Sequence, residues 1–125
     1  MAEITVTEGD NSKADFTLTY SQSWSDSTKR GLPVLKADTT KVFFYVAKTI
    51  TGTPWLTLSD ASASQIQWLD TANGKIRVFF NGNQGTSTQI GDGQFYELRL
   101  KMADGTYVSV ESGKFNVLNS VVDQA

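Results

Sequence analysis

The chain has 125 residues and a mass of 13.7 kDa, which fits one domain and is enough to bury a core without disulfide or metal crosslinks. It contains no cysteine and no histidine, which excludes thiol nucleophiles, Cys/His zinc sites and imidazole general bases. The formal net charge is -2 and the Lys and Arg residues are scattered, so we expect no nucleic-acid partner.

No apolar stretch approaches the length of a membrane span, so we expect no membrane partner. Residues 1–6 lack the basic start and apolar middle of a secretory signal. We therefore expect a soluble protein that reaches its destination without Sec-type export.

The first part of the chain contains two segments that predict strands. Residues 4–7 are β-prone and are followed by turn formers at residues 8–12. Residues 16–20 alternate between apolar side chains and Thr, so one face of this strand is expected to enter a core. The apolar positions of that face are Phe16, Leu18 and Tyr20.

Residues 21–40 lose this alternation in a run rich in Ser, Thr, Asp and Lys, which predicts a long loop. A short edge strand at residues 33–35 is an alternative for part of it, because Pro33 has no N–H to donate to a sheet. Long loops in compact domains are uncommon and tend to be functional or mobile. We expect residues 21–38 to be mobile in the isolated domain and to be fixed by a partner.

The middle of the chain predicts further strands. Residues 41–48 are apolar on both faces, as in a central strand; a buried helix is the alternative, but residues 42–46 are all β-branched or aromatic. Residues 55–58 predict the next strand. Residues 65–69 and 75–80 flank an Asn-Gly turn signal, so we expect them to pair antiparallel.

The clearest element is a β-hairpin at residues 96–111, in which two alternating segments flank Asp104 and Gly105. The residues expected in the core are Tyr96, Leu98, Leu100 and Met102, and those expected in water are Glu97, Arg99 and Lys101. Gly113 is expected to break the strand after the hairpin, before a last strand at residues 115–117 and a frayed polar tail from about residue 119.

The Gly-rich residues 81–93 lack the Gly-Lys-Ser/Thr ending of a phosphate loop, so we interpret them as a connection between sheets. No helical periodicity is present, and about seven to nine short strands predict an all-β, immunoglobulin-like antiparallel β-sandwich, with residues 1–125 as a single domain. Tyr96 follows residues 92–93 in the manner of a tyrosine corner, whose hydroxyl bonds back to the preceding connection.

Most of the chain resembles a known family, most clearly from residue 65 onward. The motifs that carry the resemblance are Ile66-Gln-Trp-Leu-Asp70, Asn73-Gly-Lys-Ile-Arg-Val78, Asp92-Gly93, Phe95-Tyr-Glu-Leu-Arg-Leu100, Asp104-Gly-Thr106 and Gly113-Lys-Phe-Asn-Val117. These motifs resemble the Ig-like domain of tailed-bacteriophage virion proteins, as in the N-terminal domains of phage baseplate upper proteins. The chain departs from the family in its long segment at residues 21–38. We also expect it to lack the appended receptor-binding domain of its relatives.

The resemblance implies a structural or accessory protein located in the virion, either a capsid decoration or cement protein or a tail or baseplate adaptor. It implies other virion proteins as partners, and a homo-oligomer or another symmetric assembly. It carries over no catalytic residue and no cofactor. A carbohydrate-binding module that recognises a surface glycan, or a small glycan-active enzyme, is the alternative.

The carboxylates fall mostly in turns or on polar strand faces, so we expect no catalytic residue and no enzyme activity. Residues 10–12 and 70–73 are too sparse in acids for a calcium loop, so no metal site is predicted. Trp68 shares a face with Ile66 and is predicted to be core.

Three aromatic residues are the candidate partner contacts, because exposed aromatic side chains anchor protein interfaces and stack on sugars. Trp24 lies in the polar loop, where a loop-anchoring role is the alternative to partner contact. Phe79 shares the outward face of its strand with Arg77, so we expect something to cover it. Trp55 is undecided between core and contact.

Overall fold

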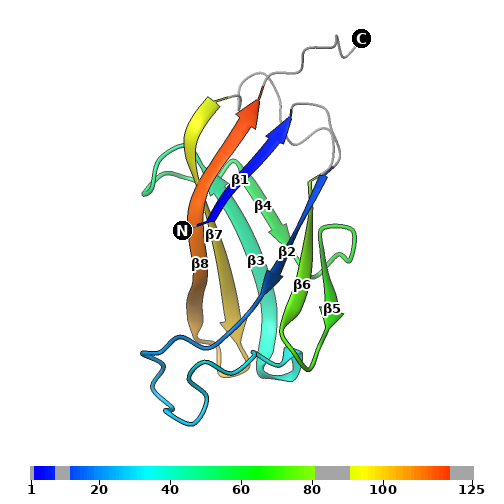
Figure 1. Ribbon diagram of the computed structural model, residues 1–125, viewed down its shortest axis with the longest axis vertical. Coiled ribbons are helices and arrows are strands. Elements are labelled where there is room, and N and C mark those ends of the chain that lie inside the picture. Colours follow the sequence, from blue (N-terminus) through cyan, green and yellow to red (C-terminus); the bar gives the residue numbers. More distant parts are fainter. Residues whose placement is uncertain (1, 8–11, 81–90, 119–125) are drawn as a thin grey trace.

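A computed structural model of the protein describes residues 2–7, 12–80 and 91–118. These residues form an all-β sandwich of two packed sheets, with eight strands and one short 3-10 helix (Figure 1). The predicted fold class is confirmed. The predictions made for residues 8–11, 81–90 and 119–125 lie outside the described residues.

The larger sheet has five strands in the order β1-β8-β7-β3-β4, and the smaller has three in the order β2-β6-β5. The strands of the larger sheet are β1 (Ala2–Thr7), β3 (Thr39–Ala47), β4 (Leu56–Ser59), β7 (Gly91–Met102) and β8 (Tyr107–Leu118). The smaller sheet contains β2 (Ser12–Thr17), β5 (Ile66–Asp70) and β6 (Lys75–Phe80), and the helix η1 (Lys36–Asp38) precedes β3.

The chain crosses repeatedly between the two sheets, as the Greek-key connections of immunoglobulin-like sandwiches require. It runs from β2 in the smaller sheet to β3 and β4 in the larger, back to β5 and β6, and finally to β7 and β8. All strand pairs are antiparallel except β1 and β8, which are parallel. The first and last strands therefore lie side by side (Figure 1).

Alternate residues of the strands meet in a core that is rich in aromatic rings. Phe44 is fully buried at its centre, with its ring stacked on Tyr96 at 5.4 Å and in edge contact with Phe80 at 5.4 Å and Phe115 at 6.2 Å. Such pairs stabilise a fold by about 0.5–1.5 kcal/mol each beyond their buried area. The predicted core faces are confirmed, since Phe16, Leu18, Tyr20, Tyr96, Leu98, Leu100 and Met102 are all buried.

The predicted hairpin is the pair β7–β8, and its turn lies at Asp104 and Gly105 as expected. Gly105 has a φ of 89°, which a residue with a Cβ adopts only with strain. The Met102 N–H donates to the Thr106 carbonyl at 2.7 Å, and the Thr106 N–H donates to Oδ1 of Asp104 at 2.9 Å. The backbone and the Asp104 side chain together close the turn.

Two expectations about this hairpin are wrong. Gly113 does not end a strand: β8 is continuous, and Gly113 pairs with Tyr96 on one side and with Ala2 on the other. The Tyr96 hydroxyl donates to Oε2 of Glu111 in β8 at 2.8 Å, and not to the preceding connection, so Tyr96 does not form a tyrosine corner. Burial and this hydrogen bond raise the pKa of Tyr96.

The other predicted elements are present with shifted ends. β2 starts at Ser12 and ends at Thr17, and the alternative edge strand after Gly31 is only a single bridge between Thr19 and Pro33. β5 and β6 pair antiparallel across the predicted turn. In that turn the carbonyl of Gly74 accepts the Leu18 N–H at 2.7 Å, and a Cβ on Gly74 would clash with the Leu18 carbonyl oxygen.

Candidate interaction surface

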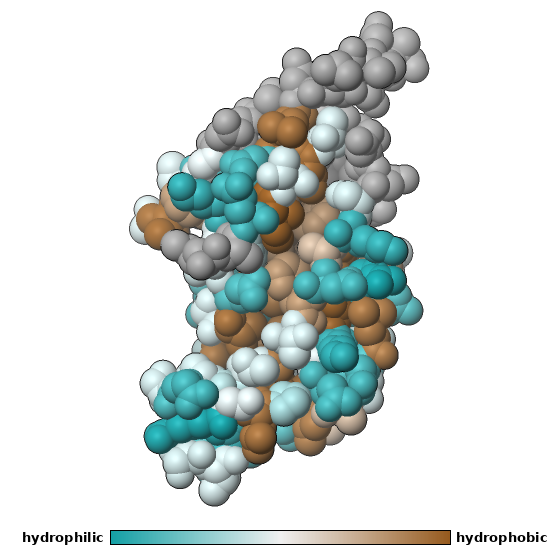
Figure 2. All heavy atoms as spheres, viewed as in Figure 1, coloured by the Kyte–Doolittle hydropathy of each residue, from teal (hydrophilic) through white to brown (hydrophobic). Residues whose placement is uncertain are grey.

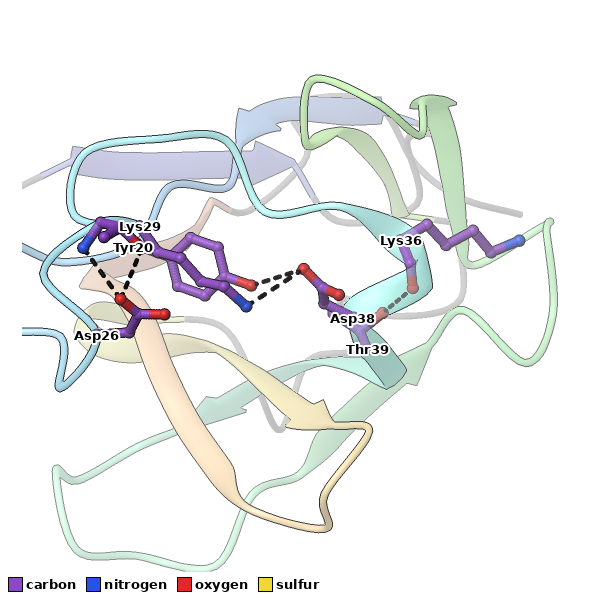
Figure 3. A network of polar contacts seen from close by, with 7 residues as sticks. Tyr20, Asp26, Lys29, Lys36, Asp38 and Thr39 are labelled. Atoms are coloured by element: carbon purple, nitrogen blue, oxygen red, sulfur yellow. Dashed lines mark hydrogen bonds and ion pairs between the residues drawn. The ribbon is translucent and has the colours of Figure 1, made fainter.

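The segment between β2 and β3 is attached to the domain by a polar cluster beside Tyr20 (Figure 3). The Tyr20 hydroxyl donates to Oδ2 of Asp38 at 3.1 Å. Nζ of Lys29 lies 3.9 Å from the same carboxylate oxygen and 5.5 Å from the centre of the Tyr20 ring. Burial, followed by the hydrogen bond to Asp38, raises the pKa of Tyr20 to about 12. The start and the end of the segment are thereby joined.

Backbone hydrogen bonds also hold this segment in place. The Tyr20 N–H donates to the Leu32 carbonyl at 3.0 Å, and the Gly31 N–H donates to the Tyr20 carbonyl at 2.9 Å. The helix η1 is connected to the hairpin tip, because the Ala103 N–H donates to the Asp38 carbonyl at 2.9 Å. The segment therefore makes contacts of its own with the domain along its path. Its mobility in the isolated domain and its fixation by a partner stay predictions.

Trp24 packs against the domain. Its ring is half-buried, 5.0 Å from that of Tyr20, and it contacts the core. Nε of Arg30 donates to the Trp24 carbonyl at 2.6 Å. The structure thus gives Trp24 the loop-anchoring role, while a partner contact through its exposed part stays a prediction. On one side of it lies a hollow of about 280 Å³ whose lining includes Tyr20, Lys29, Asp38 and Asp104.

Trp55 and Trp68 are both half-buried and fixed through their indole nitrogens. Nε1 of Trp55 donates to Oε1 of the buried Gln94 at 2.7 Å. Nε1 of Trp68 donates to Oδ2 of Asp60 at 3.1 Å, and Oδ1 of Asp60 accepts the Val42 N–H at 3.0 Å. Asp60 therefore links the two sheets. Both indoles have internal packing roles, and a partner contact by Trp55 stays a prediction.

Phe79 lies on the outer face of the smaller sheet together with Arg77, as the alternation of residues 75–80 predicts. It is half-buried and pairs with Lys13 of β2. Arg77 forms a bidentate ion pair with Asp15, with N···O distances of 2.7 and 3.0 Å. Phe79 thus lies beside charged side chains, and the exposed Leu69 of β5 lies on the same sheet.

The outer face of the larger sheet is richer in aromatic side chains, and sequence reasoning did not identify it. Phe43 and Tyr45 of β3 point away from the core and stack with ring centres 5.7 Å apart. Phe95 of β7 and Tyr107 of β8 point to the same side, and Tyr107 is 49% exposed. We call this surface the aromatic face; its residues are Phe43, Tyr45, Phe95 and Tyr107, with Ile50 beside them and with Lys41, Glu97, Arg99, Lys101 and Lys114 between and around them.

A hollow of about 380 Å³ lies on the aromatic face, where the β3–β4 connection borders the sheet. Its lining includes Tyr45, Phe95 and Arg99, together with Ile50 from the connection. Ile50 is 80% exposed, the most exposed large apolar residue in the described parts of the chain. Burial raises the pKa of the Tyr45 hydroxyl. An apolar hollow rimmed by charged side chains is the usual form of a binding surface.

The signal for the aromatic face was present in part. The apolar character of both faces of residues 41–48 predicts a strand that is covered on its outer side. The register then pairs Tyr45 with Glu97 and Phe43 with Arg99, and Lys101 with Tyr107. These β3–β7 pairs join residues more than fifty positions apart, which local alternation does not specify.

A second apolar surface lies where the edge of the larger sheet, at β8, faces the edge of the smaller sheet, at β2. β1 pairs with β8 only from Gly113 onward, and no strand in the described ranges pairs with that edge of β8 before it. Figure 2 shows a band of hydrophobic residues along this side, between hydrophilic residues. The half-buried apolar residues of these three strands are Ile4, Ala14, Val108 and Val110.

The carboxylates in the loops cap their own turns. Oδ1 of Asp26 accepts the N–H and the hydroxyl of Thr28, at 3.0 and 2.7 Å, and these bonds lower the pKa of Asp26. Asp70 is bonded in the same way to Asn73 and Ala72, which lowers its pKa. In the described part of the chain, no group of three or more His, Cys, Asp or Glu residues is placed to hold a metal ion. The same residues contain no helix long and apolar enough to cross a membrane.

A scan against protein-family models finds none that matches the sequence. A search of curated proteins likewise finds no match. The surfaces of the domain and the motifs of the sequence are therefore the basis for a proposed function.

Proposed function

We propose that this domain is a non-catalytic structural or accessory component of a bacteriophage particle, either a capsid decoration or cement protein or a tail or baseplate adaptor. It acts through protein–protein contacts and is located in the virion. The observation that carries the contact role is the aromatic face with its hollow. The resemblance of the turn and core motifs to Ig-like domains of phage virion proteins supports the setting in a particle.

The aromatic face has the composition of an interface centre. Aromatic side chains and Arg supply a large share of binding energy where water is excluded, and sheet faces that meet only water are normally polar. Here Phe43, Tyr45 and Phe95 are half-buried and Tyr107 is exposed. A partner that covers this face would bury rings that the sandwich leaves partly in water.

Incorporation into particles tests the proposal. Quantitative mass spectrometry of purified particles should detect the protein at a fixed ratio to the major virion proteins. Ile50→Ser and Tyr107→Ser should reduce this ratio, because they remove the most exposed apolar side chains of the aromatic face. Leu69→Ser is the matched control, since Leu69 is also exposed, at 43%, but lies on the smaller sheet.

The absence of the protein from purified particles would contradict the location. Normal incorporation of both aromatic-face variants would contradict the use of this face. The candidate contacts Trp24, Trp55 and Phe79 are tested in the same assay by changing each to Ser. Sedimentation of the isolated domain tests the proposed symmetric assembly. If the domain stays monomeric at all concentrations, it forms such an assembly only within the particle.

A carbohydrate-binding module is the second candidate function, and the hollow beside Trp24 favours it. This hollow combines the half-buried ring of Trp24 with the charged groups of Lys29, Asp38 and Asp104. Aromatic faces that stack on sugar rings and carboxylates that accept hydroxyl hydrogen bonds are the usual elements of a glycan site. Specific binding on a glycan array that is lost in Asp104→Ala would favour this function.

A further inference from the structure

Four of the eleven Lys and Arg side chains of this acidic protein lie together on the aromatic face. The whole chain has a formal charge of -2. On the outward side of β3, β7 and β8, however, the cations are Lys41, Arg99, Lys101 and Lys114, and the carboxylate is Glu97. A second carboxylate, Glu3 of the adjacent β1, pairs with Lys114, and the face keeps an excess of positive charge. The screening length of electrostatic interactions is about 8 Å at physiological salt. Charged side chains on adjacent strands therefore attract the same charged group of a partner.

From this distribution, and relying on the proposed function, we infer that the aromatic face binds an acidic surface of a different protein. The partner has carboxylates around an apolar centre: the apolar centre enters the hollow at Tyr45 and Phe95, and the carboxylates meet the surrounding cations. Complementary charge of this kind chiefly determines which partner binds and how fast it associates.

Two of the cations are held in place over an aromatic ring. The guanidinium of Arg99 and Nζ of Lys101 lie over the Tyr107 ring, 5.4 and 5.8 Å from its centre. The carboxylate of Glu97 is 4.0 Å from Nη1 of Arg99, at the limit of an ion pair. Nε of Arg99 is itself buried, so a partner would meet the outer Nη groups of the guanidinium and not Nε. A planar guanidinium held in this way is well suited to a carboxylate, which it binds through parallel N–H donors.

The same charges oppose a two-fold dimer formed through this face. A two-fold interface brings the same patch of both copies together, so the excess of cations on this face would meet the same excess on the other copy. Like charges placed together across an interface are strongly unfavourable. A symmetric assembly of this protein is therefore expected to use another surface, and to leave the aromatic face for the acidic partner.

Titration of the isotope-labelled domain with model polymers tests the inference by NMR. The probe is a random copolymer of glutamate and tyrosine, and a lysine–tyrosine copolymer is its charge-reversed counterpart. The glutamate copolymer should shift the amide resonances of outward residues in β3, β7 and β8. Its affinity should fall about tenfold or more when salt is raised from about 50 mM to about 500 mM. The lysine copolymer should not bind.

Charge reversal provides the matched variants. Lys101→Glu should weaken binding of the glutamate copolymer about tenfold. Lys114→Glu, at an exposed position, repeats the test if the first variant folds poorly. Lys75→Glu is the control, because Lys75 is exposed on the smaller sheet, and it should change the affinity less than about twofold.

Equal binding of the two copolymers, or binding of neither, would overturn the acidic partner. Preferential binding of hyaluronan, an anionic polysaccharide, over the glutamate copolymer would also overturn it, since the face would then select a glycan. Measuring incorporation into particles distinguishes a failure of the acidic-partner inference from a failure of the proposed docking role. If Tyr107→Ser reduces incorporation while Lys101→Glu and Lys114→Glu do not, the docking role holds and the acidic partner is refuted.

Discussion

Leu98→Ala should be among the most damaging single changes in the core. Leu98 is fully buried in β7, between Phe44 of β3 and Glu111 of β8. Truncation removes buried methyl groups and leaves a cavity, at a cost of about 2–5 kcal/mol. Because Phe44 is held by Phe16, Phe80, Tyr96 and Phe115, the neighbouring rings have little freedom to collapse into the space. We therefore expect the upper part of that range, about 3–5 kcal/mol.

Urea unfolding followed by tryptophan fluorescence measures this cost. With a denaturant slope of about 2 kcal/mol/M, the urea midpoint of Leu98→Ala should fall by about 1.5–2.5 M. Arg99→Ala, one residue away on the outer face, should change the free energy of unfolding by less than about 0.5 kcal/mol. A cost near zero for Leu98→Ala, or equal costs for the two variants, would refute the orientation of β7.

Three further predictions concern the packing of Trp24 and the polar contacts of Tyr20 and of the turn carboxylates. Trp24→Ser should lower the free energy of unfolding by about 1–3 kcal/mol, because the indole packs on Tyr20 and the core; an unchanged thermal transition would show that the ring does not anchor the loop. The raised pKa of Tyr20, about 12 against an ordinary 10.0, means that stability is complete below pH 10 and falls as pH rises toward 12, as the unfolded chain ionises first. Tyr20→Phe should reduce this alkaline loss, and an identical pH profile for both proteins would contradict the hydrogen bond to Asp38. The pKa values of Asp26, Asp70 and Asp104 are lowered from 3.8 by turn hydrogen bonds, so stability should fall as pH drops below about 4, where the unfolded chain takes up protons first. Asp70→Ala should make that acid loss shallower, and a steeper loss would count against the capping bonds.

The strands and their buried faces followed from the sequence because they depend on local alternation. Phe16, Leu18 and Tyr20 share a buried face, as predicted, although β2 itself ends at Thr17. The hairpin turn was predicted from the residue types Asp104 and Gly105, and Gly105 has the positive φ that such turns require. These features involve residues within a few positions of one another.

Features that join distant segments did not follow from the sequence. The Tyr96 hydroxyl bonds to Glu111, and which residue of β8 faces Tyr96 depends on a bulge between Leu98 and Arg99. The path of residues 21–38 depends on the bond between Tyr20 and Asp38, eighteen positions apart. Polar composition indicated a loop there, but it contains no information about which residues at the two ends of the loop form hydrogen bonds with each other. The aromatic face was missed for the same reason, since it arises only when three strands are placed in register.

Lysine footprinting of the free domain and of the assembled particle tests the central claim most directly. Acetylation of intact samples, followed by mass spectrometry, reports the exposure of each lysine side chain. Lys41, Lys101 and Lys114 surround the aromatic face, whereas Lys13 and Lys75 lie on the smaller sheet and serve as internal controls. Docking through the aromatic face predicts that the first three are protected in the particle while the other two stay reactive. Equal labelling of all five, or protection of Lys13 and Lys75 alone, would contradict it.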